Sequence, residues 1–318
     1  MSFASAPPAG HLLRSPVETD AASIAALYAS IQNALYGESE TAEAEVRFTW
    51  AWPRFDLARD AWLVATEDRV VAYAWVWGPR LRVPRVEFDS TLQLAIDPVA
   101  SAVAPALLDR MESRVREMAR EQDIAEPPTM VLTASSLDAR KRDALVARGY
   151  QQGRTFFHME CALDVAFAAP RWPHGVEVAL FRPGLDDADV HDTVNDAFAE
   201  HYRWMREPLE EWRALRHHEF APDLTFIVRH EGRAIATSVN YRSGHDGYIG
   251  MLGVRRAWRR RGLATALLLH SFAAFQRAGV TRALLGVDSE NADDAVRLYE
   301  AVGMRVTRKN VFYSRVLE

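Results

Sequence analysis

With 318 residues, of which 49% are hydrophobic, the chain is long enough to form a large core, and typical domain sizes predict two domains. The formal net charge of −5 argues against a dedicated nucleic-acid binder, because affinity for phosphate backbones comes mostly from clustered positive charge. A single cysteine, Cys161, excludes a disulfide framework and a multi-cysteine zinc site, and it indicates a reducing compartment.

No apolar run in the sequence is long enough to cross a membrane. Residues 1–10 lack the basic and apolar segments of a secretory signal. A cytoplasmic protein with no nucleic-acid partner and no membrane partner is therefore expected.

Apolar periodicity predicts the elements of the first half of the chain. Residues such as Ile24, Leu27 and Ile31 recur at helical spacing, which gives one helix a buried stripe. The predicted elements are a strand at 11–14, helices at 19–36 and 42–57, the second of which Pro53 would end or kink, strands at 62–66, 70–77 and 91–96, a helix at 102–122, a strand at 130–133, a helix at 138–148 and a strand at 155–163.

Residues 165–175 carry two prolines and a tryptophan without periodicity, so a linker between two domains is predicted there. The order of elements after the linker repeats the order before it, which predicts a duplicated domain over residues 1–164 and 176–318. The predicted elements of the second half are a strand at 176–182, helices at 186–204 and 208–220, strands at 224–230, 233–241 and 248–254, a helix at 263–279, a strand at 282–287, a helix at 292–302 and a strand at 305–317.

The stretch 248–265 joins an apolar strand to a helix through a loop of arginines and one glycine. Backbone N–H groups at a helix N-terminus have no partners within the helix, so a glycine that allows close approach makes them a cradle for phosphate. Gly262 provides the glycine, and Arg259, Arg260 and Arg261 add positive charge. A solvated basic turn, or a patch for nucleic acid or membrane, is the alternative interpretation of the arginines. The order of strand, basic loop, glycine and helix favours the anion cradle.

Two motifs resemble those of the GCN5-related N-acetyltransferase family. The run Arg259-Arg260-Arg261-Gly262-Leu263-Ala264 resembles the family's acyl-coenzyme A signature, Gln/Arg-x-x-Gly-x-Gly/Ala. The block from Asn291 to Met304, with Leu298-Tyr299-Glu300 inside it, resembles the family's pattern of Asn, Ala, Leu-Tyr-Glu and Gly-Phe. The duplication is similar to that of two-domain members of the family. The resemblance implies an α/β fold of two tandem domains, each with a mixed, mostly antiparallel central sheet flanked by helices.

The resemblance also implies a site for acetyl-coenzyme A as the acyl donor, with no metal. Backbone N–H groups at the start of the helix would hold the pyrophosphate. The strand before the cradle would splay from its neighbour and pair with the pantetheine arm, which Asn291 would also hydrogen-bond. The phenol of Tyr299 would protonate the departing thiolate. The implied coenzyme residues are Leu252, Gly253, Val254, Arg259, Arg260, Arg261, Gly262, Leu263, Ala264, Thr265 and Asn291, and the implied catalytic residue is Tyr299.

The implied function is the direct transfer of an acetyl group to the primary amine of a small molecule, by a monomer or a homodimer. The alternative is a non-catalytic acyl-coenzyme A sensor or partner-binding module. Two roles have structural alternatives as well, since Tyr299 has the spacing of a buried helix residue and Asn291 fits a helix N-cap. The strand before the cradle carries no carboxylate, so the general base stays open. The candidates are His201, Glu200, the pair His217-His218 with Glu219, and a water chain.

The first repeat lacks the residues that carry the implied chemistry. Alignment of the two halves places residues 98–105, which include neither glycine nor arginine, at the position of the cradle. It places Leu145 opposite Tyr299 and Leu137 opposite Asn291. The N-terminal domain is therefore expected not to bind acetyl-coenzyme A, and to pack, dimerise or shape the acceptor site.

Overall fold

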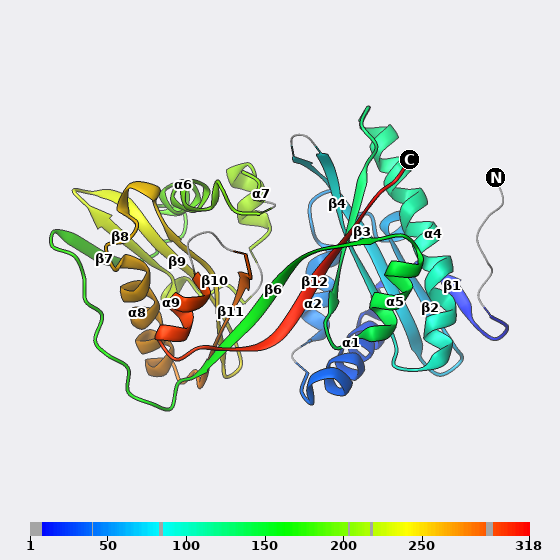
Figure 1. Ribbon diagram of the computed structural model, residues 1–318, viewed down its shortest axis with the longest axis horizontal. Coiled ribbons are helices and arrows are strands. Elements are labelled where there is room, and N and C mark those ends of the chain that lie inside the picture. Colours follow the sequence, from blue (N-terminus) through cyan, green and yellow to red (C-terminus); the bar gives the residue numbers. More distant parts are fainter. Residues whose placement is uncertain (1–7, 40, 83–84, 203, 217–218, 291–294) are drawn as a thin grey trace. The chain divides into compact units, whose positions relative to one another are not determined.

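The computed structural model describes residues 8–39, 41–82, 85–202, 204–216, 219–290 and 295–318. The chain forms two compact units (Figure 1). The first consists of Met1–Arg154 together with Asn310–Glu318, and the second of Thr155–Lys309. No helix of the described residues is long and apolar enough to span a membrane.

The elements of the first repeat follow the predicted order, with differences in length. The predicted helix at 42–57 stops before Pro53 and is replaced by two shorter helices, because proline lacks the N–H that the helix interior needs. The elements are β1 (Leu12–Arg14), η1 (Glu18–Asp20), α1 (Ala21–Tyr36), α2 (Glu43–Trp50), α3 (Leu57–Asp60), β2 (Ala61–Ala65), β3 (Val70–Arg82), β4 (Arg85–Leu94), α4 (Pro98–Glu121), β5 (Thr129–Ser135), α5 (Ala139–Ala147) and β6 (Gln151–Ala162).

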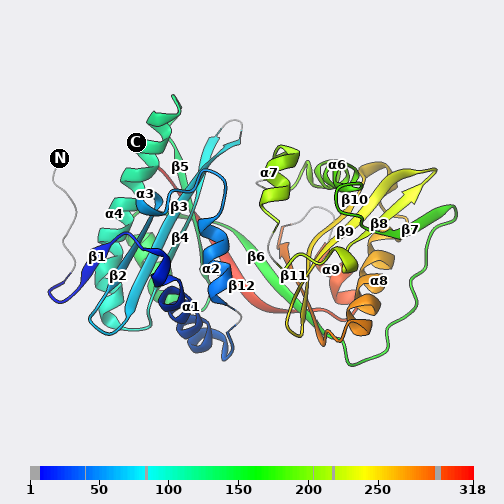
Figure 2. The ribbon, with the colours of Figure 1, turned by 180° about the vertical axis from the view of Figure 1, so that it is seen from behind.

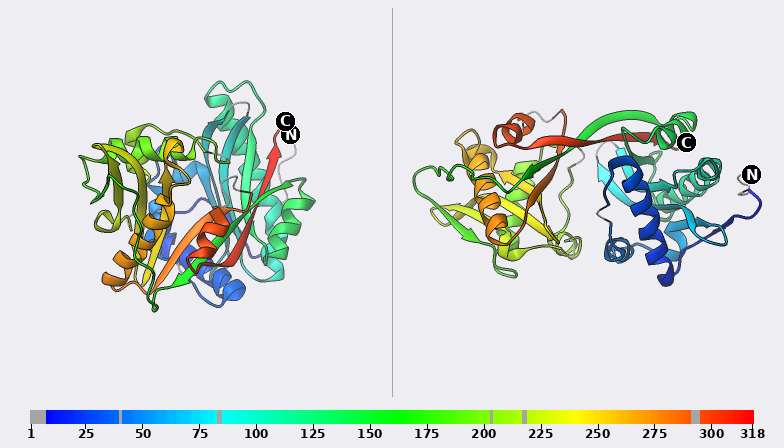
Figure 3. Two further views of the ribbon diagram at one scale, coloured as in Figure 1. Left: turned by 60° about the vertical axis from the view of Figure 1, so that its left-hand side comes forward. Right: turned by 90° about the horizontal axis from the view of Figure 1, so that it is seen from below.

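The second repeat has the same succession of strands and helices, except that two α-helices follow its first strand where three follow β1. Figure 3 shows it in two further views, in which the last strand follows directly on the last helix. The elements are β7 (Val176–Leu180), α6 (Asp187–Phe198), α7 (Leu209–Ala214), η2 (Pro222–Leu224), β8 (Phe226–His230), β9 (Arg233–Ser243), β10 (Asp246–Val254), η3 (Arg256–Trp258), α8 (Leu263–Arg277), β11 (Arg282–Asp288), α9 (Ala295–Ala301) and β12 (Arg305–Val316).

Each unit contains a mixed, mostly antiparallel sheet. The strand order is β1-β2-β3-β4-β5-β12 in the first unit and β7-β8-β9-β10-β11-β6 in the second. The pairs β4–β5 and β10–β11 are parallel, and the other pairs within each unit are antiparallel. The predicted fold class, a tandem of two such sheets flanked by helices, is confirmed.

The two repeats exchange their last strands. Strand β6 of the first repeat pairs with β11, from Ala162↔Arg282 to Phe156↔Asp288, and β12 of the second repeat pairs with β5. The division between the units therefore falls at residues 154 and 310 and differs from the predicted linker at 165–175, which lies inside the second unit. Apolar periodicity predicts that a strand exists, but it does not say which sheet the strand joins.

The segment between the repeats packs against α8. The side-chain amide of Gln276 donates hydrogen bonds of 2.8 Å to the carbonyl oxygens of Leu163 and Val165. The ring of Trp172 lies with its centroid 5.8 Å from that of His270. These contacts fix a stretch that the sequence presents as an unstructured linker.

Helices cover both faces of each sheet. In the first unit, α4 and α5 lie in front of the sheet in Figure 1, and α1 and α2 lie in front of it in Figure 2, which is the view from behind. In the second unit, neighbouring residues of β8 belong to different cores. Phe226 packs in the core of α8, whereas Ile227 packs in the core of α6 and α7. This alternation leaves the backbone edges of the strands, rather than their faces, available for a site.

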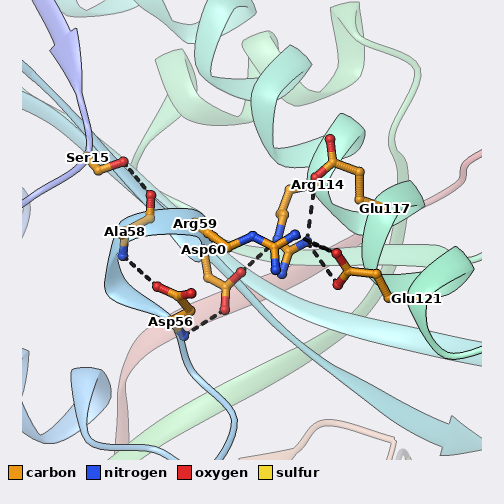
Figure 4. A network of polar contacts seen from close by, with 8 residues as sticks. All are labelled: Ser15, Asp56, Ala58, Arg59, Asp60, Arg114, Glu117 and Glu121. Carbon is orange, nitrogen blue, oxygen red and sulfur yellow. Dashed lines mark hydrogen bonds and ion pairs between the residues drawn. The ribbon is translucent and has the colours of Figure 1, made fainter.

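A buried ion-pair network fastens α4 to α3 in the first unit (Figure 4). The guanidinium of Arg114, 8% exposed, donates a 2.8 Å hydrogen bond to the carboxylate of Asp60, 1% exposed. Glu121 lies 3.2 Å from the same guanidinium, and the backbone N–H of Asp56 donates to Asp60 at 2.8 Å. The charges are therefore compensated inside the fold.

The substitution Arg114→Met should be strongly destabilising, because it leaves the carboxylate of Asp60 buried without its cation. Losses of about 3–5 kcal/mol in the free energy of unfolding are typical of such a change. Urea unfolding should show a loss of this size, which a second change, Asp60→Asn, restores in part. The control is Arg120→Met in the exposed part of the same helix, for which we expect at most about 0.5 kcal/mol. Equal losses in the two single variants would contradict the role of the buried pair.

Candidate active site

The second unit contains a cavity of about 720 Å³. Its lining comes from β6, β10, β11, α8 and α9, from the end of α6 and the loop after it, and from the loop between β10 and α8. Every lining residue belongs to the second unit. Among the described residues, no group of three or more His, Cys, Asp or Glu side chains is arranged to hold a metal ion.

The cavity opens where two neighbouring parallel strands stop pairing. Strands β10 and β11 are paired from Asp246↔Arg282 to Ile249↔Leu285. Both strands continue beyond that point, to Val254 and Asp288, without further pairing between them. The edge of β10 that faces β11 from Gly250 onward therefore offers backbone N–H and C=O groups to a ligand.

A β-bulge at Gly250 lies where the two strands separate. The register between β10 and β9 shifts between Ile249 and Met251, so Gly250 is the extra residue. A bulge bends its strand and increases the local twist, which accounts for the divergence from β11. A Cβ atom at Gly250 would lie 2.5 Å from Cε2 of Tyr241. The bulge therefore requires glycine unless the ring of Tyr241 moves.

The start of α8 forms the predicted cradle. Two residues before it have positive φ, Arg260 at 59° and Gly262 at 80°. The helix starts with the bond from the N–H of Ala266 to the carbonyl oxygen of Gly262, 3.0 Å long, so the N–H groups of residues 263–265 have no acceptor within the helix. Gly262 and residues 263–265 all line the cavity. The partial positive charge of the helix N-terminus thus faces it.

The three arginines of the loop have different environments. Arg259 and Arg260 line the cavity. The guanidinium of Arg259 also donates a 2.7 Å hydrogen bond to the carbonyl oxygen of Ala197, which holds the loop to the end of α6. Arg261 stacks on the ring of Trp258, with 4.5 Å from its Cζ to the centroid, and donates to a backbone oxygen of its own loop. Arg261 therefore packs along the loop and does not line the cavity.

The structure brings most of the predicted residues together around the cavity. Gly253 is not in its lining, because it backs onto α6, where an added Cβ would lie 3.1 Å from the Cβ of Ala197. Asn291 lies outside the described residues. The predicted residues that line the cavity are Leu252, Val254, Arg259, Arg260, Gly262, Leu263, Ala264, Thr265 and Tyr299.

Tyr299 lies on α9, and its side chain packs against the core cluster that includes the buried residues of α8. Burial raises the pKa of its phenol to about 12, and the nearby phenol of Tyr248 acts in the same direction. The pKa of Tyr248 is raised as well, chiefly by burial, and the backbone N–H of Gly286 donates to its oxygen. Tyr299 therefore stays a neutral hydrogen-bond donor across the physiological range of pH.

Phe156 and Asp288 line the cavity and were not predicted from the sequence. They are direct register partners on β6 and β11. Asp288 is 7% exposed, and its Oδ1 accepts a 3.0 Å hydrogen bond from the N–H of Glu290. The available signal for Asp288 was its place at the carboxyl end of a parallel strand, where ligands of α/β sheets bind. Phe156 gave no such signal, because it depends on the strand exchange.

Of the candidates for the general base, only those that line the cavity can reach a substrate there. His201 lines it, with its ring centroid 4.4 Å from that of Phe198. Glu200 does not line it and forms a 3.0 Å ion pair with Arg256. The pair His217-His218 lies outside the described residues. His201 and Asp288 are thus the imidazole and the carboxylate among the described residues that line the cavity.

The first unit has its own carboxylate at the position of the cradle. Asp97 caps α4, and its side chain accepts a 2.8 Å hydrogen bond from the N–H of Ala100. The same carboxylate forms a 2.7 Å ion pair with Arg69. Leu145, opposite Tyr299 in the alignment, is fully buried, and Leu137, opposite Asn291, is exposed. The helix start that would face an anion is therefore already neutralised by a side chain.

Comparisons with known proteins agree with this architecture. Residues 189–304 match the acetyltransferase (GNAT) family. A mycothiol acetyltransferase of Thermobispora bispora is 32% identical over 177 residues, which make up 52% of this chain and 59% of that protein. Over this and three further relatives of the same name, the matched part spans 56–65% of the relative's length, which is less than two thirds.

Two solved structures share the fold over nearly the whole chain. A GCN5-related N-acetyltransferase from Sphaerobacter thermophilus is 28% identical with a TM-score of 0.83, and the match covers 98% of each chain. A tandem GNAT protein from the clavulanic acid biosynthesis pathway is 15% identical with a TM-score of 0.69, over 97% of this chain and 99% of that one. The family match lies within the unit that holds the cavity, and it covers the cradle, the unpaired edge of β10 and Tyr299. Residues 189–304, inside the second unit, are thus the part of the chain that matches the acetyltransferase (GNAT) family.

Proposed function

We propose that the second unit transfers an acetyl group from acetyl-coenzyme A to the primary amine of a small molecule. The observation that carries the proposal is one continuous cavity that joins an unpaired strand edge, a helix N-terminus and the phenol of Tyr299. Acetyl-coenzyme A is an extended molecule that fits these three features. Its amide groups match the strand edge, its negative charge matches the helix N-terminus, and its sulfur matches the phenol of Tyr299. The names of the relatives support the acetyl group and a small-molecule acceptor.

The coenzyme fits the cavity through backbone groups. The pyrophosphate lies at the start of α8, where the N–H groups of residues 263–265 and the charge of Arg259 and Arg260 meet it. The amides of the pantetheine arm pair with β10 at Leu252 and Val254, in place of the missing strand neighbour. Gly253 takes part through its backbone, and Asn291 binds the same arm. Arg261 contributes by holding the loop through Trp258.

The reaction needs orientation and one proton donor. The amine nitrogen attacks the thioester carbon, the new C–N bond replaces the C–S bond, and the amine loses the proton that the sulfur finally gains. Tyr299 donates its hydroxyl proton toward the departing sulfur, since its raised pKa keeps the phenol protonated. Holding both reactants in one cavity supplies much of the remaining rate.

The first unit binds no coenzyme in this proposal. The carboxylate of Asp97 occupies the N-terminus of α4 and repels a pyrophosphate there. The first repeat instead supports the second unit by donating β6 to its sheet.

The change Tyr299→Phe separates catalysis from binding. We expect kcat to fall about 100-fold, a typical contribution of general acid catalysis, with the acetyl-coenzyme A Kd unchanged. Steady-state release of free thiol and calorimetric titration with acetyl-coenzyme A measure the two quantities. An unchanged kcat would remove Tyr299 from the mechanism. Binding of acetyl-coenzyme A without any turnover in the wild type would instead favour the acyl-coenzyme A sensor.

Tyr299 should remain protonated well above the ordinary range of tyrosine. The phenol has a pKa of 10 in an unfolded chain and about 12 in the fold, so its contribution to stability is present below pH 10 and is lost as pH rises from 10 to 12. Ultraviolet titration of the wild type minus Tyr299→Phe should show the lost phenolate only as the pH nears 12. A difference signal centred near pH 10 would contradict the buried phenol.

Gly262→Ala tests the cradle against a control in the same helix. Gly262 and Gly279 flank α8, both have positive φ, and neither has an atom within 4 Å of an added Cβ. Each change to alanine should cost about 1 kcal/mol of stability through backbone strain. Only Gly262→Ala should also weaken acetyl-coenzyme A binding, by about 10-fold, the equivalent of one backbone hydrogen bond to a charged group. Equal affinities in the two variants would place the pyrophosphate elsewhere.

A further inference from the structure

Charge is unevenly distributed over the lining of the cavity. Its cations, Arg259 and Arg260, lie in the loop that leads into α8. Asp288, at the end of β11, is the one carboxylate among the described residues that line the cavity. A donor that places its phosphates on the arginines leaves the acidic end for the second substrate.

Asp288 has a hydrophobic neighbour on the adjacent strand. It pairs directly with Phe156 of β6, so the two side chains leave the same face of the sheet, about 5 Å apart at Cβ. The ring centroid of Phe156 lies 6.5 Å from that of Tyr202, and both rings line the cavity. A carboxylate and two rings thus form one continuous wall.

A second pair of rings extends the same wall from the end of α6. Phe198 and Trp204 lie 5.0 Å apart at their centroids and both line the cavity. The indole N–H of Trp204 donates a 3.2 Å hydrogen bond to the side-chain oxygen of Asn195, which fixes the ring. Fixed aromatic faces bind flat ligand surfaces at little cost in side-chain entropy.

We propose that Asp288 binds the ammonium group of the acceptor, and that Phe156 and Tyr202 contact a ring beside that group. The acceptor is then a primary amine carried next to an aromatic or sugar ring, rather than an alkyl chain or an acidic peptide. The proposal rests on the acetyl transfer proposed above and names the acceptor class of the same site. It also gives the first repeat a part in specificity, because Phe156 comes from its last strand.

The N–H of Glu290 donates to Oδ1 of Asp288, and a carboxylate has two oxygens with about four lone-pair positions in all. The substitution Asp288→Asn keeps an oxygen for that N–H and removes the negative charge at nearly unchanged size. The substitution therefore distinguishes two roles of Asp288, the binding of an ammonium group and the capping of the backbone at the end of the strand.

The test uses the full chain, acetyl-coenzyme A and four probe amines of similar size. Phenethylamine offers an aromatic ring, D-glucosamine a sugar ring, n-hexylamine a chain without a ring, and a Gly-Asp dipeptide an acidic peptide. Release of free thiol gives kcat and KM for each amine, and calorimetry gives the Kd of acetyl-coenzyme A. The variants are Asp288→Asn, Phe156→Leu and the control Glu160→Gln, which removes a carboxylate of β6 that does not line the cavity.

We expect one of the two ring-bearing amines to be preferred, which identifies the kind of ring. Asp288→Asn should raise its KM about 10- to 100-fold, the range for hydrogen bonds to charged groups, with the acetyl-coenzyme A Kd unchanged. Phe156→Leu should reduce the preference for the ring over n-hexylamine about 2- to 10-fold. Glu160→Gln should change neither quantity.

Three results would overturn the inference while acetyl-coenzyme A still binds. They are an unchanged KM in Asp288→Asn, equal or better use of n-hexylamine or the dipeptide, and no thiol release with either ring-bearing amine. A wild type that does not bind acetyl-coenzyme A would instead refute the proposed function itself, and the acceptor site would fall with it.

Discussion

The site depends on the point where β10 and β11 cease to pair, after Ile249 and Leu285. An interior strand normally has both edges satisfied, and an unpaired edge inside a fold is costly unless a partner fills it. Here the bulge at Gly250 turns β10 away from β11, and the absence of a side chain at that glycine allows Tyr241 to pack where a Cβ would stand. The same divergence leads from the strand edge to the start of α8, so the cradle and the edge belong to one cavity.

The strand exchange makes this site a product of both repeats. Strand β6 completes the sheet of the second unit and brings Phe156 beside Asp288, while β12 completes the sheet of the first unit and brings Arg315 within 2.8 Å of the buried Glu112. The two repeats therefore differ at the equivalent helix start, which is α8 in the second repeat and α4 in the first. Gly262 leaves the amides of α8 open, whereas Asp97 closes those of α4 with its own carboxylate. One copy has an open helix start at a cavity, and the other has a helix start that its own side chain caps.

The parts of the fold that the sequence predicts well are local in the chain. The order of elements, the duplication and the cradle follow from periodicity and from a strand, loop and helix that are contiguous. The partners of β6 and β12 were not predictable in this way, since they depend on contacts far apart in sequence. Side-chain direction was equally hidden: Arg261 has the same charge as its neighbours, yet it stacks on Trp258, and Asp288 gains its place in the cavity only through the end of β11.

We propose that only the second unit binds the coenzyme, because the helix start of α8 is left open there, whereas Asp97 caps the start of α4 in the first unit. Calorimetric titration of the full chain with acetyl-coenzyme A measures this directly through the stoichiometry. The account predicts one molecule per chain, both in the wild type and in Asp97→Ala, since the first unit also lacks the glycine and the arginines. Two molecules bound per wild-type chain would contradict it.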